Sequence, residues 1–125
     1  MDLKLAQLSY PVSDVERAVG FFEGKLGLKL MLRPHAHMAF FDLGGGIAMM
    51  VERADDLRAG SILYLACDDV AQATAELQAK GIEIVSPPHR ITEQPTYDLW
   101  MSFFKEPDGR LMALHMTAPK GWRPS

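Results

Sequence analysis

The sequence predicts an α+β fold built from two copies of a β-α-β-β-β module within one domain. The expected order of one strand, one helix and three strands occurs twice along the 125 residues. Short stretches also correspond between the copies: Ser13-Asp14-Val15 matches Asp68-Asp69-Val70. We place module one at about residues 3–53, a linker at 54–60, module two at about 61–117 and a tail at 118–125.

Module one begins with a strand expected over residues 3–12, followed by a helix. Ser13 is the expected N-cap, and Glu16 lies three residues further, as in a capping box. Apolar residues recur at helical spacing up to Leu26, and Gly27 stands where a C-terminal cap belongs. Three strands are expected next, over residues 28–33, 35–43 and 47–53, with Pro34 between the first two and glycines 44–46 in the last turn.

Module two repeats this order with a longer middle segment. A strand over residues 61–67 precedes a helix that either Asp68 or Asp69 caps and Gly81 ends. A strand over 83–86 is expected to end at Pro87-Pro88, which opens a long loop. Loops of this length often cover a binding site. Strands over 97–104 and 111–115, joined by a turn at 106–109, complete the module.

Composition excludes several classes of function. The net charge of −3 and pI near 5.7 give no electrostatic footprint for nucleic acid or an anionic membrane. No apolar run approaches the length of a transmembrane helix. The single cysteine, Cys67, forms no internal disulfide and is typical of a reducing compartment, so we expect a cytoplasmic protein. Two acids follow Cys67 and raise the pKa of its thiol, which argues against a reactive thiolate.

Three stretches together resemble a known family. They are residues 11–18 (Pro-Val-Ser-Asp-Val-Glu-Arg-Ala), residues 67–70 (Cys-Asp-Asp-Val) and residues 103–111 (Phe-Phe-Lys-Glu-Pro-Asp-Gly-Arg-Leu). In this order they resemble the vicinal oxygen chelate superfamily of glyoxalases, bleomycin-resistance proteins and extradiol dioxygenases. The resemblance covers nearly the whole chain. It implies a cupped, mostly antiparallel eight-stranded sheet around a small-molecule pocket, and a homodimer. It does not specify a reaction, because the fold hosts many.

The resemblance also implies where relatives hold a catalytic metal. The corresponding positions here are Gln7, Met50 (Met49 if the register slips), Ile62 and Ala113. Ile62 and Ala113 have no donor atom, and a methionine thioether suits a hard cation poorly. We therefore expect no metal and no other cofactor. A metal site shifted along the strands remains open. Glu52 lies two residues beyond Met50 and His115 two residues beyond Ala113, so each is on the same strand face as the position that lacks a ligand. The alternative interpretation is that both residues lie at solvent-exposed strand ends.

The vacated pocket is expected to be apolar. The chain has eight methionines, and methionine adapts to irregular apolar ligands. His35 and His37 are expected to share one face of a strand. The residues predicted to bind a ligand are Gln7, Met50, Tyr64, Tyr97, Trp100 and Arg90.

Three functions fit these observations. The first is a metal-free small-molecule-binding protein of the glyoxalase/bleomycin-resistance type that holds an apolar or aromatic ligand in the cup. The second is a glyoxalase-like lyase or isomerase, or a dioxygenase-related enzyme, with a non-standard or absent metal site. Its acid–base candidates are Glu52, His115 and His37. In the third, the cup is vestigial and the domain serves a larger assembly.

Overall fold

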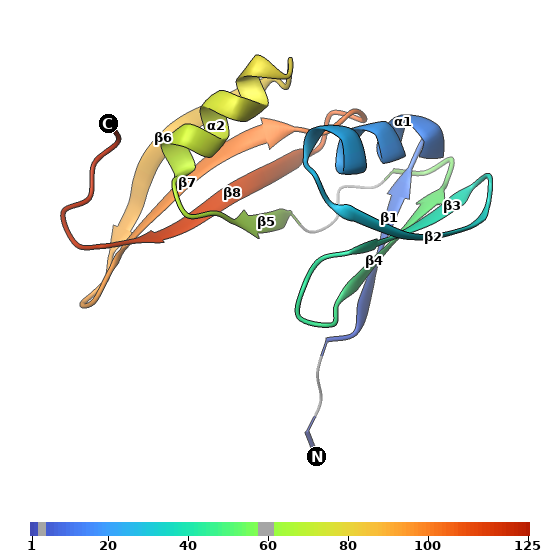
Figure 1. Cartoon of the computed structure of the whole chain (residues 1–125), viewed down its shortest axis with the longest axis horizontal. Helices are drawn as coiled ribbons and strands as arrows, with labels where there is room; N and C mark the ends of the chain where they lie inside the picture. The colour runs from blue at the N-terminus through green and yellow to red at the C-terminus, as the bar shows by residue number, and fades with distance from the viewer. Residues whose placement is uncertain (3–4, 58–61) are drawn as a thin grey trace. The chain divides into compact units, whose positions relative to one another are not determined.

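A computed structural model describes residues 1–2, 5–57 and 62–125, which divide into two compact units, Met1–Ala59 and Gly60–Ser125. Each unit contains one strand, a helical segment and three further strands, as Figure 1 shows. The predicted α+β fold of two βαβββ modules is therefore confirmed. The predicted first strand, linker and start of module two lie partly outside the described residues, at 3–4 and 58–61.

Module one forms a four-stranded sheet in the order β1-β4-β3-β2. Strand β1 runs parallel to β4, whereas the β3–β4 and β2–β3 pairs are antiparallel. Its elements are β1 (Gln7–Val12), α1 (Val15–Val19), the π-helix η1 (Gly20–Lys25), β2 (Lys29–His35), β3 (Met38–Asp42) and β4 (Ala48–Arg53).

Module two repeats this topology in the order β5-β8-β7-β6. Again one pair, β5–β8, is parallel and the other two are antiparallel, as predicted for a mostly antiparallel fold. Its elements are β5 (Leu63–Ala66), α2 (Val70–Ala79), β6 (Ile84–Glu93), β7 (Asp98–Lys105) and β8 (Leu111–Ala118).

The N-cap of α1 is Asp14, so the predicted Ser13 cap and its capping box with Glu16 are wrong. The Asp14 carboxylate accepts a hydrogen bond of 3.0 Å from the backbone N–H of Arg17. Asp14 has the extended backbone of a cap, and the helix therefore starts one residue later than expected. Glu16 instead forms an ion pair of 2.6 Å with Arg33. In module two, either Asp68 or Asp69 was expected to cap the helix. The N-cap is Asp69, whose carboxylate accepts hydrogen bonds from the backbone N–H groups of Ala71 and Gln72.

The helical segment of module one changes from α to π geometry at Gly20. The Leu26 N–H donates to the Phe21 carbonyl five residues back, at 3.0 Å. Gly27 ends the segment with a φ of +72°, as predicted for a C-terminal cap. The spacing of apolar residues could not distinguish this local expansion from a regular α-helix.

Strand β2 continues through Pro34, which was expected to separate two strands. Because β2 is an edge strand, the missing N–H of Pro34 need not break a ladder of hydrogen bonds. His35 therefore ends β2, and His37 lies in the turn before β3. The two histidines do not share a strand face, so that prediction is wrong, although their ring centroids lie 6.5 Å apart.

Strand β6 likewise continues through Pro87-Pro88 to Glu93, so the predicted long loop is mostly strand. This strand is also an edge strand, and its register shifts between Ser86 and His89 accommodate the prolines. Only residues 94–97 form a turn before β7, closed by a 2.8 Å hydrogen bond from Gln94 N to Tyr97 O. The expected loop over a binding site is therefore replaced by an edge strand.

Each module has its own core between the helix and one face of the sheet. In module one, the fully buried Phe22 contacts the rings of Tyr10 and Phe41 at centroid distances of 5.7 and 5.6 Å. In module two, the Thr74 hydroxyl of α2 lies 2.7 Å from the Ser102 hydroxyl of β7. One face of each sheet is therefore committed to packing, and the other face carries no helix of the same module.

The C-terminal segment after β8 is held by Asp98, a buried residue at the start of β7. Its carboxylate accepts hydrogen bonds from Lys120 Nζ at 2.8 Å and Gly121 N at 3.0 Å. Trp122 packs edge-on against Trp100, with ring centroids 5.1 Å apart. In the part of the chain that the structure describes, no helix has the length and apolarity needed to cross a membrane.

Candidate functional site

The face of each sheet that points away from its own helix is called here the open face. Its residues follow from the strand pairing, because directly paired residues share a face. In module one the residues on the helix side, Met49 and Val51, are fully buried, so the alternating residues Met50 and Glu52 lie on the open face. This places the predicted Met50, not Met49, away from the core.

The open face of module one has an apolar row across its centre. Met50 pairs with Ser9 on one side and Phe40 on the other, and Phe40 pairs with Leu32. Met50 and Phe40 are half-buried, whereas Leu32 is 57% exposed. The row therefore offers apolar surface that the helix of this module does not cover.

Polar residues flank this row on both sides. One flanking row consists of Pro11, Glu52, Met38 and His35. The other consists of Gln7, Ala48, Asp42 and Lys29. The structure thus brings the predicted residues Gln7, Met50 and Glu52 onto one face, with Gln7 and Glu52 exposed.

The open face of module two has two central rows. The first row consists of Tyr64, Ala113, Phe103 and Ser86. The second consists of Ala66, His115, Met101 and His89. Tyr64 is 52% exposed, and His115 and Met101 are half-buried. The predicted residues Tyr64 and His115 therefore lie in neighbouring rows of one face, beside aromatic and thioether groups.

A hollow of about 370 Å³ lies at the edge of this sheet, next to His115. It is lined by Ala66, Cys67, Asp68, His115, Met116, Thr117 and Pro119. Burial, and then the neighbouring carboxylates of Asp68 and Asp69, raise the pKa of the Cys67 thiol. The thiol is therefore neutral at physiological pH, as predicted.

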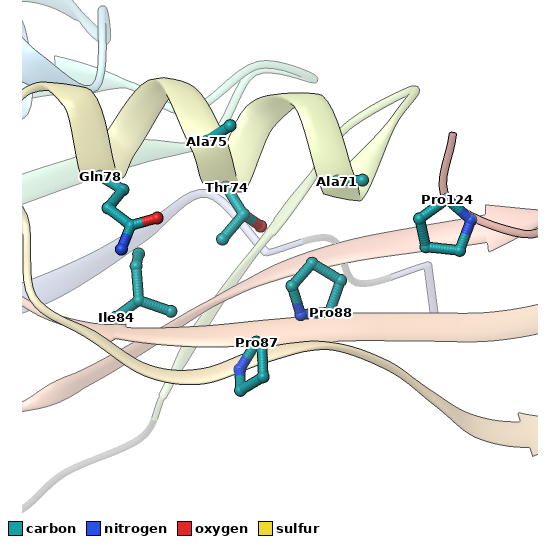
Figure 2. Close-up of a pocket in the computed structure, with 8 residues that line it drawn as sticks. All are labelled: Ala71, Thr74, Ala75, Gln78, Ile84, Pro87, Pro88 and Pro124. Atoms are coloured by element: carbon teal, nitrogen blue, oxygen red, sulfur yellow. The ribbon is translucent and has the colours of Figure 1, made fainter.

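A larger cavity of about 530 Å³ lies on the helix side of the same sheet. Figure 2 shows side chains of α2 on one side of it and Pro87 and Pro88 of β6 on the other, with Pro124 at one end. The Thr74 hydroxyl in its lining already bonds Ser102 and the Val70 carbonyl. This cavity therefore offers little polar chemistry and lies on the opposite face from His115.

Four other predicted residues do not join the open faces. Trp100 lies on the helix side, where it pairs with Met116 and contacts Trp122. Arg90 is the cross-strand neighbour of Trp100 and forms an ion pair of 3.3 Å with Glu93. Tyr97 is half-buried in the turn before β7, and His37 is exposed in the turn between β2 and β3.

Sequence reasoning counted Met101 and Phe103 only among the strand residues that could line the cup, and it considered His89 only as a loop residue. Strand pairing places all three on the open face of module two, and the His89 and Phe103 rings lie 6.3 Å apart. Alternation along residues 97–104 was the available signal. It could not show which alternate set faces the helix, because both sets contain aromatic residues.

Three of the four residues at the expected metal positions do not fit a divalent ion, and Gln7 alone has a donor oxygen. Met50 is on the open face of module one, and Ala113, which is fully buried, is on the open face of module two. Ile62 is half-buried just before β5. Across residues 1–2, 5–57 and 62–125, no three histidine, cysteine, aspartate or glutamate side chains gather as metal ligands. The absence of a metal stays a prediction.

Comparison with known families gives one match over most of the chain. The family model described as Glyoxalase/Bleomycin resistance protein/Dioxygenase superfamily matches residues 4–114. A search of curated protein sequences finds no match to this chain.

Solved structures of the same architecture are numerous. The antibiotic-binding protein TnmS3 from Streptomyces sp. CB03234 is 25% identical, with a TM-score of 0.73 over 94% of this chain and 98% of that one. TioX from Micromonospora sp. ML1 is 22% identical, with a TM-score of 0.70 over 91% and 98%. Lactoylglutathione lyase from Agrobacterium tumefaciens is 17% identical, with a TM-score of 0.72 over 93% and 95%. The last two likenesses bear on the fold alone.

Proposed function

Because the chain belongs to the glyoxalase/bleomycin resistance protein/dioxygenase superfamily, we propose that it binds an apolar or aromatic small molecule on its open sheet faces, without a metal. The observation that carries this proposal is the chemistry at two positions where relatives hold metal ligands. Met50 lies between Ser9 and Phe40, and Ala113 lies between Tyr64 and Phe103. A thioether beside Phe40 and a methyl group between Tyr64 and Phe103 suit an apolar ligand better than a hard cation.

The similarity to an antibiotic-binding protein supports this type of function. TnmS3 shares 25% of its residues with this chain over nearly the full length of both. Each open face offers apolar surface that an aromatic ligand would cover: Leu32 of module one is 57% exposed, and Tyr64 of module two is 52% exposed. Burial of such surface stabilises a complex by roughly 25 cal/mol per Å² before the costs of binding are subtracted.

Thermal unfolding with a panel of aromatic and polyketide antibiotics tests the proposal. In buffer with EDTA, at least one compound is expected to raise the Tm saturably, because a ligand at 100 times its Kd adds about 2.7 kcal/mol of stability. Met50→Lys in module one and Phe103→Lys in module two should together abolish the shift, since each puts a charge into an apolar row of one open face. Gln72→Lys is the matched control, because Gln72 lies exposed on α2.

Two results would contradict the proposal. One is the absence of stabilisation by any compound in the panel. The other is turnover of methylglyoxal and glutathione with added Ni²⁺ or Zn²⁺ that Glu52→Ala abolishes, which would favour the glyoxalase-like enzyme instead.

The assembly and the location are proposed on separate grounds. We propose a homodimer, as in the two-module relatives that the sequence resembles. We also propose a cytoplasmic location, because the chain has one cysteine, Cys67, whose thiol is free.

A further inference from the structure

The two open faces differ in charge. The open face of module one carries two carboxylates, Glu52 and Asp42, against one lysine, Lys29, and one histidine, His35, in the rows that flank Met50. The paired positions on the open face of module two carry no aspartate or glutamate. They carry His89 and His115 instead, with Lys105 one row further along β7. An anionic group therefore meets less repulsion on the face of module two.

Two acidic residues of this sheet, Asp98 and Glu93, lie on the helix side and are paired with basic side chains. Asp98 lies on the helix side, buried and bonded to Lys120. Glu93 is the cross-strand neighbour of Asp98 and forms an ion pair with Arg90. Glu83 forms an ion pair of 3.3 Å with Lys105, and Asp68 lines the hollow beside His115.

The hydrogen bond of His89 determines when its ring can donate to a ligand. Its Nδ1 lies 2.8 Å from the Pro87 carbonyl oxygen, which only accepts, so Nδ1 carries the proton. In the neutral ring, Nε2 is then an acceptor and repels an anionic oxygen. In the protonated ring, Nε2 donates a charge-assisted hydrogen bond. The affinity for an anion at His89 therefore rises as the pH falls.

An aromatic surface adjoins these histidines. Phe103 and Tyr64 occupy the neighbouring row, and the His89 ring is tilted by 32° to the Phe103 ring at 6.3 Å. Met101 lies between the two histidines as their direct cross-strand neighbour. A flat ring system can lie over Tyr64 and Phe103 while a group on its border reaches the histidine row.

We propose that the ligand is an aromatic acid, with its ring system on the Tyr64 and Phe103 row and its acidic oxygen at His89 and His115. This inference rests on the proposed small-molecule function and names the ligand class of the same site. The titratable groups beside the histidines are Tyr64 on β5 and Cys67 and Asp68 at the hollow. Lys105 lies four residues from Met101 along β7 and pairs with Glu83 at 3.3 Å.

Two fluorescent probes that differ by one acidic group test the inference. 1-Anilinonaphthalene-8-sulfonate carries a sulfonate that stays ionised, and N-phenyl-1-naphthylamine has the same rings without it. Titrated into the full chain, the sulfonate should bind about five- to tenfold more tightly at pH 6 than at pH 8, since charged hydrogen bonds are the stronger class. The neutral probe should change less than about twofold, because it has no group for the histidines to recognise.

Variants locate the effect. His89→Gln and His115→Gln should each reduce the pH dependence for the sulfonate, and should change the affinity for the sulfonate more than the affinity for the neutral probe. His37→Gln is the matched control, because it removes one titratable imidazole from the turn of module one. It should leave both probes unaffected.

The outcomes separate the two proposals. Binding of the neutral probe with no pH-dependent preference for the sulfonate would overturn acid recognition and leave the small-molecule site standing. An equal loss of pH dependence in His37→Gln would also overturn it, since net charge would then be the cause. If neither probe binds, acid recognition fails and the site on which it rests loses support as well.

Discussion

At the residue scale, Asp98 shows how one buried carboxylate organises a chain end. Asp98 is 1% exposed, and it accepts hydrogen bonds from a side chain and a backbone amide of the C-terminal segment. The hydrogen bond from Lys120, and then that from the Gly121 N–H, lower the pKa of Asp98. Both donors favour the ionised carboxylate, so the folded state should prefer the charged form.

We therefore expect Asp98→Asn to lower the Tm at neutral pH, because asparagine keeps the shape but loses the charge. The pKa of Asp98 is lower in the folded protein than in the unfolded chain. The ionised carboxylate therefore contributes its full stabilisation above the unfolded pKa of about 3.9, and this stabilisation is lost as the pH falls through the folded pKa. The difference in Tm between the two proteins should thus narrow from pH 5 to pH 2.

Circular dichroism melts at several pH values measure this difference. Asp55→Asn is the control, because the Asp55 side chain is 89% exposed in its ion pair with Arg53. A difference in Tm between the wild type and Asp98→Asn that stays constant down to pH 2 would show that ionisation of this carboxylate contributes nothing to stability.

At the element scale, two glycines in the first helical segment have different roles. Gly27 has a φ of +72° and ends the segment, whereas Gly24 lies within η1 with no positive φ. A Cβ added at either position meets no atom within 4 Å. Backbone conformation alone therefore separates the two positions, which makes them a matched pair.

Gly27→Ala should destabilise the protein by about 1–2 kcal/mol, the cost of a left-handed conformation for a residue with a Cβ. Gly24→Ala should stabilise it by about 0.5–1 kcal/mol, since alanine has less backbone freedom to lose on folding. Chemical denaturation of both variants measures the change in the free energy of unfolding. The same sign for both changes would contradict this account of the helix end.

At the scale of the whole molecule, each sheet exposes apolar side chains on one of its edge strands. This strand is β2 in module one and β6 in module two. In module one, Met31 on β2 is 56% exposed. In module two, Val85 and Ile91 on β6 are 46% and 43% exposed. Proteins normally cover such edges, and a second copy of the chain is the cover that a homodimer supplies.

Light scattering is expected to give twice the chain mass of 13.9 kDa at micromolar concentration. Met31→Glu combined with Ile91→Glu should shift the mass toward the monomer, because carboxylates on an apolar edge oppose its burial. Gln72→Glu, an exposed change on α2, should leave the mass unchanged. A wild-type protein that is monomeric at micromolar concentration would contradict the homodimer.

The repeat of elements, the helix ends at Gly27 and Gly81 and the turns at Gly44–Gly46 and Gly109 could all be predicted from local signals. Each of these glycines has a positive φ, the conformation that the residue type predicts. The prolines were misleading, because Pro34, Pro87 and Pro88 end a strand only where its N–H groups are needed. Only the sheet order shows that they lie on edge strands.

The sequence by itself determined the βαβββ repeat and the lack of donor atoms at Ile62 and Ala113, because periodicity and side-chain chemistry are local properties. Only the tertiary structure decided which alternate residues of a strand face the helix. It places Met50 and Tyr64 on the open faces and Trp100 on the helix side. The physical reason is that strand pairing is long-range. A shift of one residue in register exchanges the two faces, and no local pattern in an all-apolar strand opposes that shift.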